Sequence, residues 1–254
     1  NSVPAAQTVA EDTILPIVGV SVADVDSTAL TTTLNVSSGI LNVTAGAGVS
    51  GNGSASVSIA GTAAEINAAL AGLAYTGNLD FNGGDILTVV TGDGTATDTD
   101  TIAITVNPVN DAPALNLDAD SSTTGGVDYL TAFTDGGPAV VIVDTDVLIT
   151  DSDDTELTSA TVTLTNPDTD DVLVFNGTPP LGITTFLYDP LTGILTLTGT
   201  ASRADYQTAL QQITFDNPGT TPSTDTRIID VVVNDGTAAS NLAHAIIHVA
   251  QVNN

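Results

Sequence analysis

The sequence contains the same unit twice, and this internal repeat constrains the fold more strongly than any other feature. The segment Thr62–Gly77 (TAAEINAALAGLAYTG) returns at Ser202–Asn217 as SRADYQTALQQITFDN. In both copies an Asp-Gly turn and an alternating, strand-like segment follow. Self-similarity in a fixed order indicates that each copy is one structural unit. We therefore predict two domains, residues 1–111 and 112–254, of which the second carries insertions in its loops.

Residues that favour β-strands dominate the apolar part of the chain. Hydrophobic residues make up 42% of the sequence, mostly Val, Ile, Leu and Ala, while Trp, Met and Cys are absent. Ile102 and Ile104 alternate with smaller neighbours, as in a strand that buries one face. Short strands separated by Gly, Asn, Asp and Pro turns are typical of a sandwich of about seven strands. We predict an all-β fold of two tandem Greek-key β-sandwiches, stacked end to end.

One segment of each copy has a helical pattern instead. Thr62 and Ser202 are each followed three residues later by an acidic residue, which is the pattern of a helix-capping box. Apolar residues then recur at helical spacing, for example Ile66, Leu70 and Leu73 in the first copy. We predict one short helical crossover in each sandwich, with a packing role and no chemistry.

The charge balance restricts the partners of the chain. It has 30 acidic and 2 basic residues, a net charge of −28, so nucleic acids and anionic membranes are disfavoured as partners. Without Lys or Cys, a Schiff base, a Walker-type phosphate loop and a sulfur-ligated metal are excluded. No apolar run approaches the roughly 18 residues of a membrane span, so membrane insertion is not expected. Self-repulsion of this size predicts bound cations or a high-salt environment.

The acidic residues are of a kind that suits calcium. Only three of them are Glu, and the others are Asp, which favours loops and turns where carboxylates converge with backbone carbonyls. Ca²⁺ takes six to eight such oxygens. In a Greek-key sandwich the Asp-x-Asp loops Asp24–Asp26 and Asp151–Asp153 share a pole with the turns at Asp93 and Asp235, respectively. The opposite pole of the first copy is expected to hold Glu11, Asp85, Asn107, Asn110 and Asp111.

These residues carry a family resemblance. Glu11 near the end of the first strand, Asp-x-Asp after the second and the linker Asn110-Asp111-Ala112-Pro113 resemble cadherin repeats. They are more similar still to the cadherin-like and RTX-adhesin extender repeats of large bacterial surface proteins. The resemblance spans nearly the whole chain and implies cadherin/Ig-like domains stiffened by Ca²⁺ at their junction. Its ligand pattern is matched at Glu11, Asp85, Asn107, Asn110, Asp111, Asp151, Asp153, Asp24, Asp26, Asp93 and Asp235.

The second copy departs from this pattern at two places. No Glu occupies the position of Glu11, where Asp135 is the nearest acidic residue. The chain ends at Asn253–Asn254 without the Asp and Pro of the first linker. A complete site at the C-terminal edge is therefore not expected.

Enzyme activity is not expected from the sequence. His244 and His248 lie four residues apart, which on a strand is roughly 13 Å and too far to chelate one ion. No Gly-x-Ser-x-Gly or phosphate-binding loop occurs, and a sugar-cleaving cleft without Trp is atypical. The sequence thus favours a binding or structural role outside the cell.

Three such roles remain open. The first is a spacer that extends a bacterial surface adhesin, with neighbouring repeats of the same chain as its partners. The second is a subunit of a calcium-dependent filament or surface layer, in which like subunits are the partners. The third is an adhesin module that binds a glycan or a cell-surface protein through Tyr129, Phe133 and Tyr188.

Overall fold

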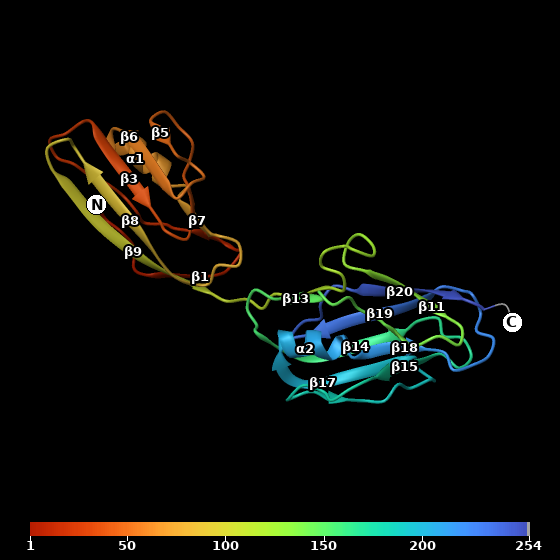
Figure 1. The fold of residues 1–254 in the computed structure, drawn as a ribbon. Coiled ribbons are helices and arrows are strands. Elements are labelled where there is room, and N and C mark those ends of the chain that lie inside the picture. The colour runs from red at the N-terminus through yellow and green to blue at the C-terminus, as the bar shows by residue number, and fades with distance from the viewer. Residues whose placement is uncertain (253–254) are drawn as a thin grey trace. The chain divides into compact units, whose positions relative to one another are not determined.

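The computed structural model describes residues 1–252, so the predicted ending at Asn253–Asn254 lies outside the described residues. The chain divides into two compact units, which we call unit 1 (Asn1–Val109) and unit 2 (Asn110–Asn254). Each unit has its own cluster of buried aliphatic residues and is a β-sandwich (Figure 1).

Unit 1 consists of a six-stranded sheet and a three-stranded sheet. The larger sheet has the strand order β1-β9-β8-β3-β6-β5, in which β1 runs parallel to β9 and the other neighbours are antiparallel. The smaller sheet has the order β2-β7-β4. The strands are β1 (Gln7–Ala10), β2 (Ile14–Pro16), β3 (Leu30–Asn35), β4 (Gly39–Asn42), β5 (Val49–Ser50), β6 (Ser56–Gly61), β7 (Ala74–Gly77), β8 (Gly83–Gly92) and β9 (Thr97–Asn107).

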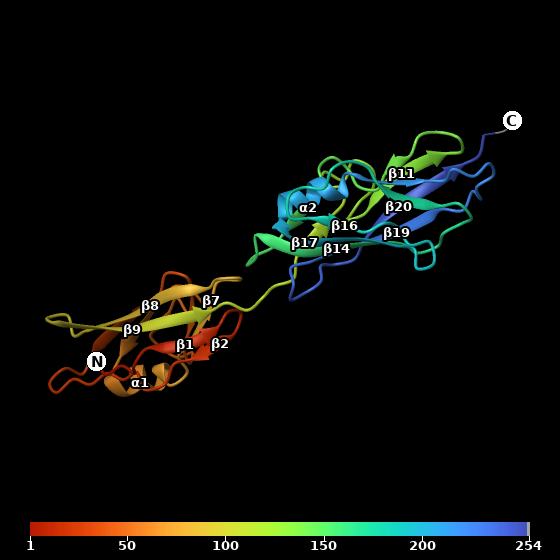
Figure 2. The same ribbon diagram turned by 90° about the horizontal axis from the view of Figure 1, so that it is seen from below.

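Unit 2 repeats this arrangement, as the ribbon views show (Figure 2). Its sheets have the orders β11-β20-β19-β14-β17-β16 and β12-β18-β15, and β11 runs parallel to β20. A further short pair joins β10 to β13. The strands are β10 (Ala114–Asn116), β11 (Tyr129–Thr134), β12 (Val140–Val141), β13 (Leu148–Thr150), β14 (Glu156–Leu164), β15 (Val172–Phe175), β16 (Thr184–Thr185), β17 (Ile194–Ser202), β18 (Ile213–Asp216), β19 (Arg227–Asn234) and β20 (Ala243–Ala250).

The all-β sandwich prediction is therefore confirmed, while the predicted number of strands was too low. In the described part of the chain each sandwich has nine strands in its two main sheets, instead of about seven. The extra pair, β5 and β6 or β16 and β17, extends the larger sheet beyond β3 or β14.

The predicted helical crossovers are present at equivalent places. Helix α1 (Ala63–Leu70) begins after Thr62, whose side chain accepts a bond from the Glu65 amide. The Glu65 carboxylate accepts the Thr62 amide in return, which completes the capping box. In unit 2, α2 (Arg203–Leu210) is capped by the Ser202 side chain, which accepts the Asp205 amide, and the helix packs against β13, β14 and β17. Their apolar faces are buried, so both helices close the core as predicted.

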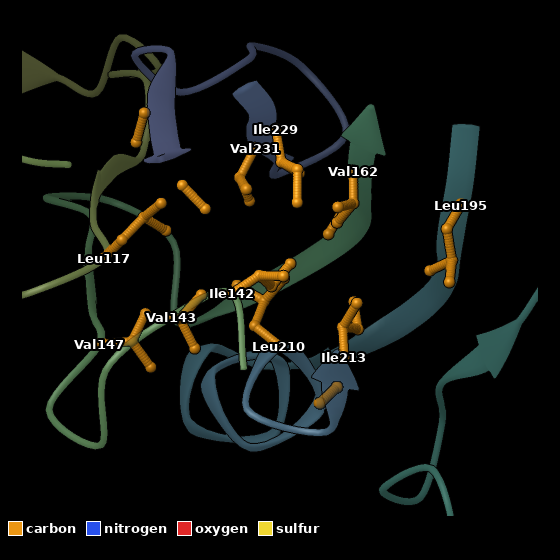
Figure 3. Close-up of a cluster of buried hydrophobic side chains, with 14 of the residues drawn as sticks. Leu117, Ile142, Val143, Val147, Val162, Leu195, Leu210, Ile213, Ile229 and Val231 are labelled. Atoms are coloured by element: carbon orange, nitrogen blue, oxygen red, sulfur yellow. The ribbon is translucent and has the colours of Figure 1, made fainter. Parts of the chain in front are cut away.

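The core of unit 2 includes apolar residues from its loops as well as from its sheets. Leu117, Val143 and Val147 are almost completely buried, together with Leu210 of α2 (Figure 3). All three lie outside the two main sheets, in the loops near β10, β12 and β13. Burial of these three residues in the core therefore fixes the backbone of the residues next to them in sequence.

Candidate metal centres

One pole of unit 1 brings together two of the predicted carboxylates. Asp24 Oδ1 accepts the amides of Asp26 and Ser27 at 3.0 and 2.7 Å. Asp93 Oδ1 accepts the amides of Thr95 and Ala96 at 2.7 and 2.8 Å. Asp24 and Asp93 line the same cavity of about 190 Å³. Asp26 belongs to the same turn as Asp24, so the predicted grouping at this pole matches the fold of unit 1.

Backbone donors keep these carboxylates ionised. The amides of Ser27 and Asp26 lower the pKa of Asp24, although the charge of Asp93 acts in the opposite direction. The amides of Ala96 and Thr95 lower the pKa of Asp93. Both groups are therefore anions at neutral pH. Oxygen anions on a shared cavity are a chemistry that suits a divalent cation.

The opposite pole of unit 1 contains Glu11 and Asn107. Glu11 is only 4% exposed, its carboxylate accepts the amide of Val109 at 2.5 Å, and its own amide donates to the Asn107 carbonyl. Beside it, Asp12 Oδ1 accepts the amide of Asp80 at 3.3 Å. Asp12 and Asp80 both have φ of +55°, a conformation that Asp tolerates better than most residues. Of Glu11, Asp12 and Asp80, the sequence had indicated only Glu11.

Asp85 lies at this end of β8 but has a different environment. Its two carboxylate oxygens accept the amides of Ser37 and Ser38 at 3.0 and 2.9 Å and the Tyr75 hydroxyl at 3.1 Å. Burial and the neighbouring Asp85 charge raise the pKa of Tyr75, so the hydroxyl remains a donor. Asp85 itself is only 4% exposed. Because its oxygens are occupied within unit 1, we leave Asp85 out of the ligand set proposed below.

The role of Asp85 as an acceptor within unit 1 can be tested by substitution. The Asp85→Ala variant is expected to lose about 2–4 kcal/mol of stability in unit 1, because two buried amides and a hydroxyl lose their acceptor. Calcium affinity, measured by calorimetric titration of the folded variant at low temperature, is expected to stay within twofold of the wild-type value. The opposite pattern, a small change in unfolding and a large loss of affinity, would make Asp85 a ligand after all.

In unit 2 the linker residues bond directly to the predicted loops. The Asp111 amide donates to Asp153 Oδ2 at 2.7 Å, and the Asn110 side chain donates to Asp235 Oδ2 at 3.0 Å. Partial burial alone would raise the pKa of Asp235, but donors from Ala238 and Asn110 outweigh it and lower the pKa. Asp151 turns the loop by accepting the Asp153 amide. Four predicted residues of unit 2, Asn110, Asp111, Asp153 and Asp235, are therefore joined by hydrogen bonds in two pairs.

Two oxygen atoms of this loop have unsatisfied bonding capacity. Asp151 Oδ2 and Asp153 Oδ1 are buried, and the structure gives neither a hydrogen-bond partner. A buried carboxylate oxygen without a donor is costly. A cation is a natural partner for such oxygens.

A second acidic cluster in unit 2 was missed by the sequence analysis. Asp118, Asp120, Asp144 and Asp146 each place a carboxylate oxygen within 4.8 Å of those of the other three. Asp118 is completely buried, whereas Asp120 is exposed. Oxygens around one Ca²⁺ at about 2.3–2.6 Å are at most about 5 Å apart, so the cluster has the size of a calcium shell.

Hydroxyl and amide donors surround the cluster. Thr123 donates both its amide and its hydroxyl to Asp118, which lowers the pKa of that carboxyl well below its usual range. Asp146 accepts the amides of Ala119 and Asp120 at 3.2 and 2.7 Å. In the described residues neither Arg is bonded to the cluster: Arg203 donates to the backbone carbonyl of Asp151, and Arg227 bonds to Asp168 and Asp171. In the described residues the four carboxylates thus have no cationic side chain as a partner.

The core explains how this cluster is held together. Asp118 follows Leu117, Asp144 follows Val143 and Asp146 precedes Val147, and these three apolar neighbours are buried (Figure 3). The sequence signal was the Asp-x-Asp spacing, which occurs at 118–120 and again at 144–146. The cluster was missed because its two Asp-x-Asp segments have no matching Asp-x-Asp segments in the first copy, and the sequence comparison relied on such matches.

The histidines and aromatic residues have ordinary roles. His244 lies between Asp128 and Asp230, with nitrogen–oxygen distances of 3.2 and 3.6 Å, and is partly exposed. The proposed receptor surface around Tyr129 and Phe133 was wrong, because these side chains are 8% and 0% exposed. Phe133 instead packs edge-on against Phe215 in the core. Of the three aromatic residues in that hypothesis, only Tyr188 lines a groove.

The fold and its acidic loops define the chain as a pair of tandem β-sandwich modules. The sequence matches no protein-family model. It is 34% identical over 180 residues, 69% of this chain, to halomucin of Haloquadratum walsbyi (strain DSM 16790 / HBSQ001). The chain spans only 2% of the length of that protein.

Solved structures with a similar chain course belong to cadherins and to a surface layer. Human protocadherin-24 EC1-2 matches with a TM-score of 0.34 at 12% identity, covering 98% of this chain and 95% of that one. Mouse cadherin-23 EC22-24 gives 0.31 at 14% identity, covering 99% and 65%. Domains 4 and 5 of the S-layer protein SbsC give 0.27 at 13%, covering 70% and 62%. Scores of this size add nothing to the strand order described above. Neither α1 nor α2, the helices of the described residues, has the length and hydropathy to span a membrane.

Proposed function

We propose that the chain is a non-catalytic, calcium-binding spacer segment of a long extracellular protein, such as a surface adhesin. The observation that carries this proposal is the cluster of Asp118, Asp120, Asp144 and Asp146, four carboxylates within 4.8 Å of one another. Calcium bound there ties the loop after β10 to the loop before β13, so unit 2 gains stability where it has no regular sheet. The match to a small fraction of halomucin is consistent with a module of a much longer polypeptide.

A second proposed calcium site is the Asp151–Asp153 loop of unit 2. Asp153 Oδ2 accepts the amide of Asp111, which joins this loop to the residues that begin unit 2. The buried oxygens Asp151 Oδ2 and Asp153 Oδ1, which have no hydrogen-bond partner, are the ligands in this proposal. Calcium there would fix the start of unit 2 against its own loop, and an ordered start of each module is what a spacer requires.

A calcium titration of the whole 254-residue chain tests the function. At a free calcium concentration of 100 times Kd, we expect about 2.7 kcal/mol of added stability per site, which raises the melting temperature by roughly 5–10 °C. We expect small-angle scattering to report a longer particle in calcium than in EDTA. Mg²⁺ at the same concentration is the control, because it prefers water and strict octahedral geometry. Equal melting curves and equal scattering in calcium and EDTA would refute the spacer function.

The filament or surface-layer role remains a second candidate. It uses the same calcium chemistry but places the ions between molecules. Calcium-dependent growth of the scattering mass with protein concentration would favour it, whereas a calcium-bound monomer favours the spacer.

A further inference from the structure

We propose that the unpaired edge of β15 in unit 2, at its Phe175 end, binds an extended, non-acidic segment of another polypeptide as an added β-strand. This role goes beyond that of a spacer, and it does not depend on calcium. It follows from a comparison of the two units, which have the same strand order but differ at one sheet edge.

In unit 1 the chain closes this edge itself. Strand β4 is the outer strand of the small sheet, and the Leu41 amide and carbonyl bond to Ser54 and Gly53, both at 2.9 Å. The side chain of Asn52 then bonds both the amide and the carbonyl of Val43, at 2.8 and 3.2 Å. The four backbone groups of Leu41 and Val43, which face away from the sheet, are therefore satisfied.

In unit 2 the corresponding groups have no partner. Leu41 pairs with Tyr75, and Leu173 of β15 pairs with Phe215, which occupies the place of Tyr75 in the repeat. The Asn176 amide donates to the Gln212 carbonyl. Because antiparallel pairs alternate, the backbone groups of Leu173 and Phe175 must face away from β18. Within residues 1–252 no hydrogen bond reaches these four groups. Leu173 is only 2% exposed, so the accessible part of this edge is at Phe175, which is partly exposed.

An apolar groove of about 400 Å³ lies along this edge. Val172–Phe175 line one side of it, and Phe186–Tyr188 of the loop after β16 line another. β16 is itself the outer strand of the large sheet, so both sheets end at this seam. Leu187 is 95% exposed and Phe186 is 55% exposed, which is unusual for such large apolar side chains. Apolar side chains of an added strand would cover them.

Two buried polar atoms at the groove match what a peptide backbone offers. The hydroxyl of Tyr188, which lines the groove, is buried without a hydrogen-bond partner. Burial, together with the charges of Asp171 and Asp189, raises the pKa of Tyr188, so this hydroxyl is a donor at neutral pH. Gln212 Oε1 is a buried acceptor without a partner, beside the groove residue Gly177. A peptide supplies the missing acceptor and donor in its carbonyl and amide groups.

The charges select the type of segment. Among the described residues, those that line the groove include no acidic residue and no Arg. With a net charge of −28, the chain repels an acidic peptide or a second copy of itself. The occupant is therefore a segment of alternating apolar side chains with neutral or basic residues between them. Main-chain bonds give the affinity in this mode, and the groove gives the side-chain preference.

The probe is an end-blocked heptapeptide of alternating valine and threonine with an arginine at each end. We expect saturable binding by fluorescence anisotropy in calcium and in EDTA alike. The amide of Phe175 is expected to become at least tenfold more protected from hydrogen exchange. A peptide with proline at its centre is expected to bind at least tenfold more weakly, because it lacks an amide for the edge.

Two matched variants separate edge pairing from simple apolar contact. Phe175→Pro removes the free amide without breaking a bond within the sheet, and Phe175→Ala removes the same ring but keeps the amide. We expect the proline variant to bind at least fivefold more weakly than the alanine variant, at equal far-UV circular dichroism. Tyr188→Phe is expected to weaken binding about threefold to tenfold.

Three results would overturn the proposal. They are the absence of saturable binding up to millimolar peptide, equal binding by the two Phe175 variants, and protection that appears away from β15. Tyr188-dependent binding of glycans without peptide binding would also overturn it. Because the probe binds in EDTA, failure here leaves the calcium-dependent spacer function untouched, and the reverse also holds.

Discussion

The Arg227→Met variant is expected to destabilise unit 2 by about 3–5 kcal/mol, the largest single effect that we predict. Arg227 is 1% exposed and donates to Asp171 at 2.5 Å and to the Asp225 carbonyl at 2.5 Å. Methionine fits the space but leaves the buried Asp171 carboxylate without its cation. Thermal unfolding of the whole chain, with hydrogen exchange to assign the transition to unit 2, measures this loss as a fall of roughly 10 °C or more.

A double variant tests whether the orphaned charge is the cause. Adding Asp171→Asn to Arg227→Met removes the uncompensated charge while keeping an acceptor for the Asn217 side chain, which bonds Asp171 at 2.7 Å. We expect the double variant to regain at least half of the lost stability. If it is no more stable than Arg227→Met alone, lost packing of the guanidinium stem explains the effect instead. The transition of unit 1 is the internal control and is expected to stay unchanged.

The position of Arg227 also shows what the sequence could and could not predict. Counting back from the shared Asp-Gly turns, Arg227 in β19 corresponds to Asp85 in β8. Both are buried at the start of equivalent strands, yet one is a cation and the other an anion. Asp85 holds the amides of Ser37 and Ser38, whereas Arg227 holds the loop around Asp168 and Asp171. The repeat predicted the strand. The opposite charges of the two side chains follow from the loop that each one bonds, which differs between the units.

The candidate sites divide in the same way. The position of Asp24 beside Asp93 was predictable, because strand connectivity in a Greek-key sandwich brings their turns to one pole. The cluster around Asp118 was not, because it arises where two irregular loops of unit 2 meet. Periodicity predicts strands and helices, but it does not predict how loops pack. The buried positions of Leu117 and Val143 decide that packing, and only tertiary structure reveals them.

The Asp144→Asn variant is expected to change the stability of unit 2 in opposite directions with and without calcium. In EDTA the variant should melt at a higher temperature than the wild type, because one of four clustered negative charges is gone. In saturating calcium it should melt lower, because a carboxylate ligand has become a weaker amide. We expect at least a tenfold loss of calcium affinity at this site by titration calorimetry, equivalent to about 1.4 kcal/mol.

Asp170→Asn is the matched control for this reversal. Asp170 is an exposed residue of unit 2 with φ of +69°, which Asn also tolerates, and it lies outside the cluster. It removes the same charge, so it reports the general effect of lowering the net charge of −28. We expect both of its melting curves to shift by less than a degree or two. Asp144→Asn and Asp170→Asn variants that behave alike would mean that the four carboxylates are a solvated acidic surface. A crossing of the melting curves for Asp144→Asn alone would make them a calcium site, since only a bound cation turns a repulsive cluster into a stabilising one.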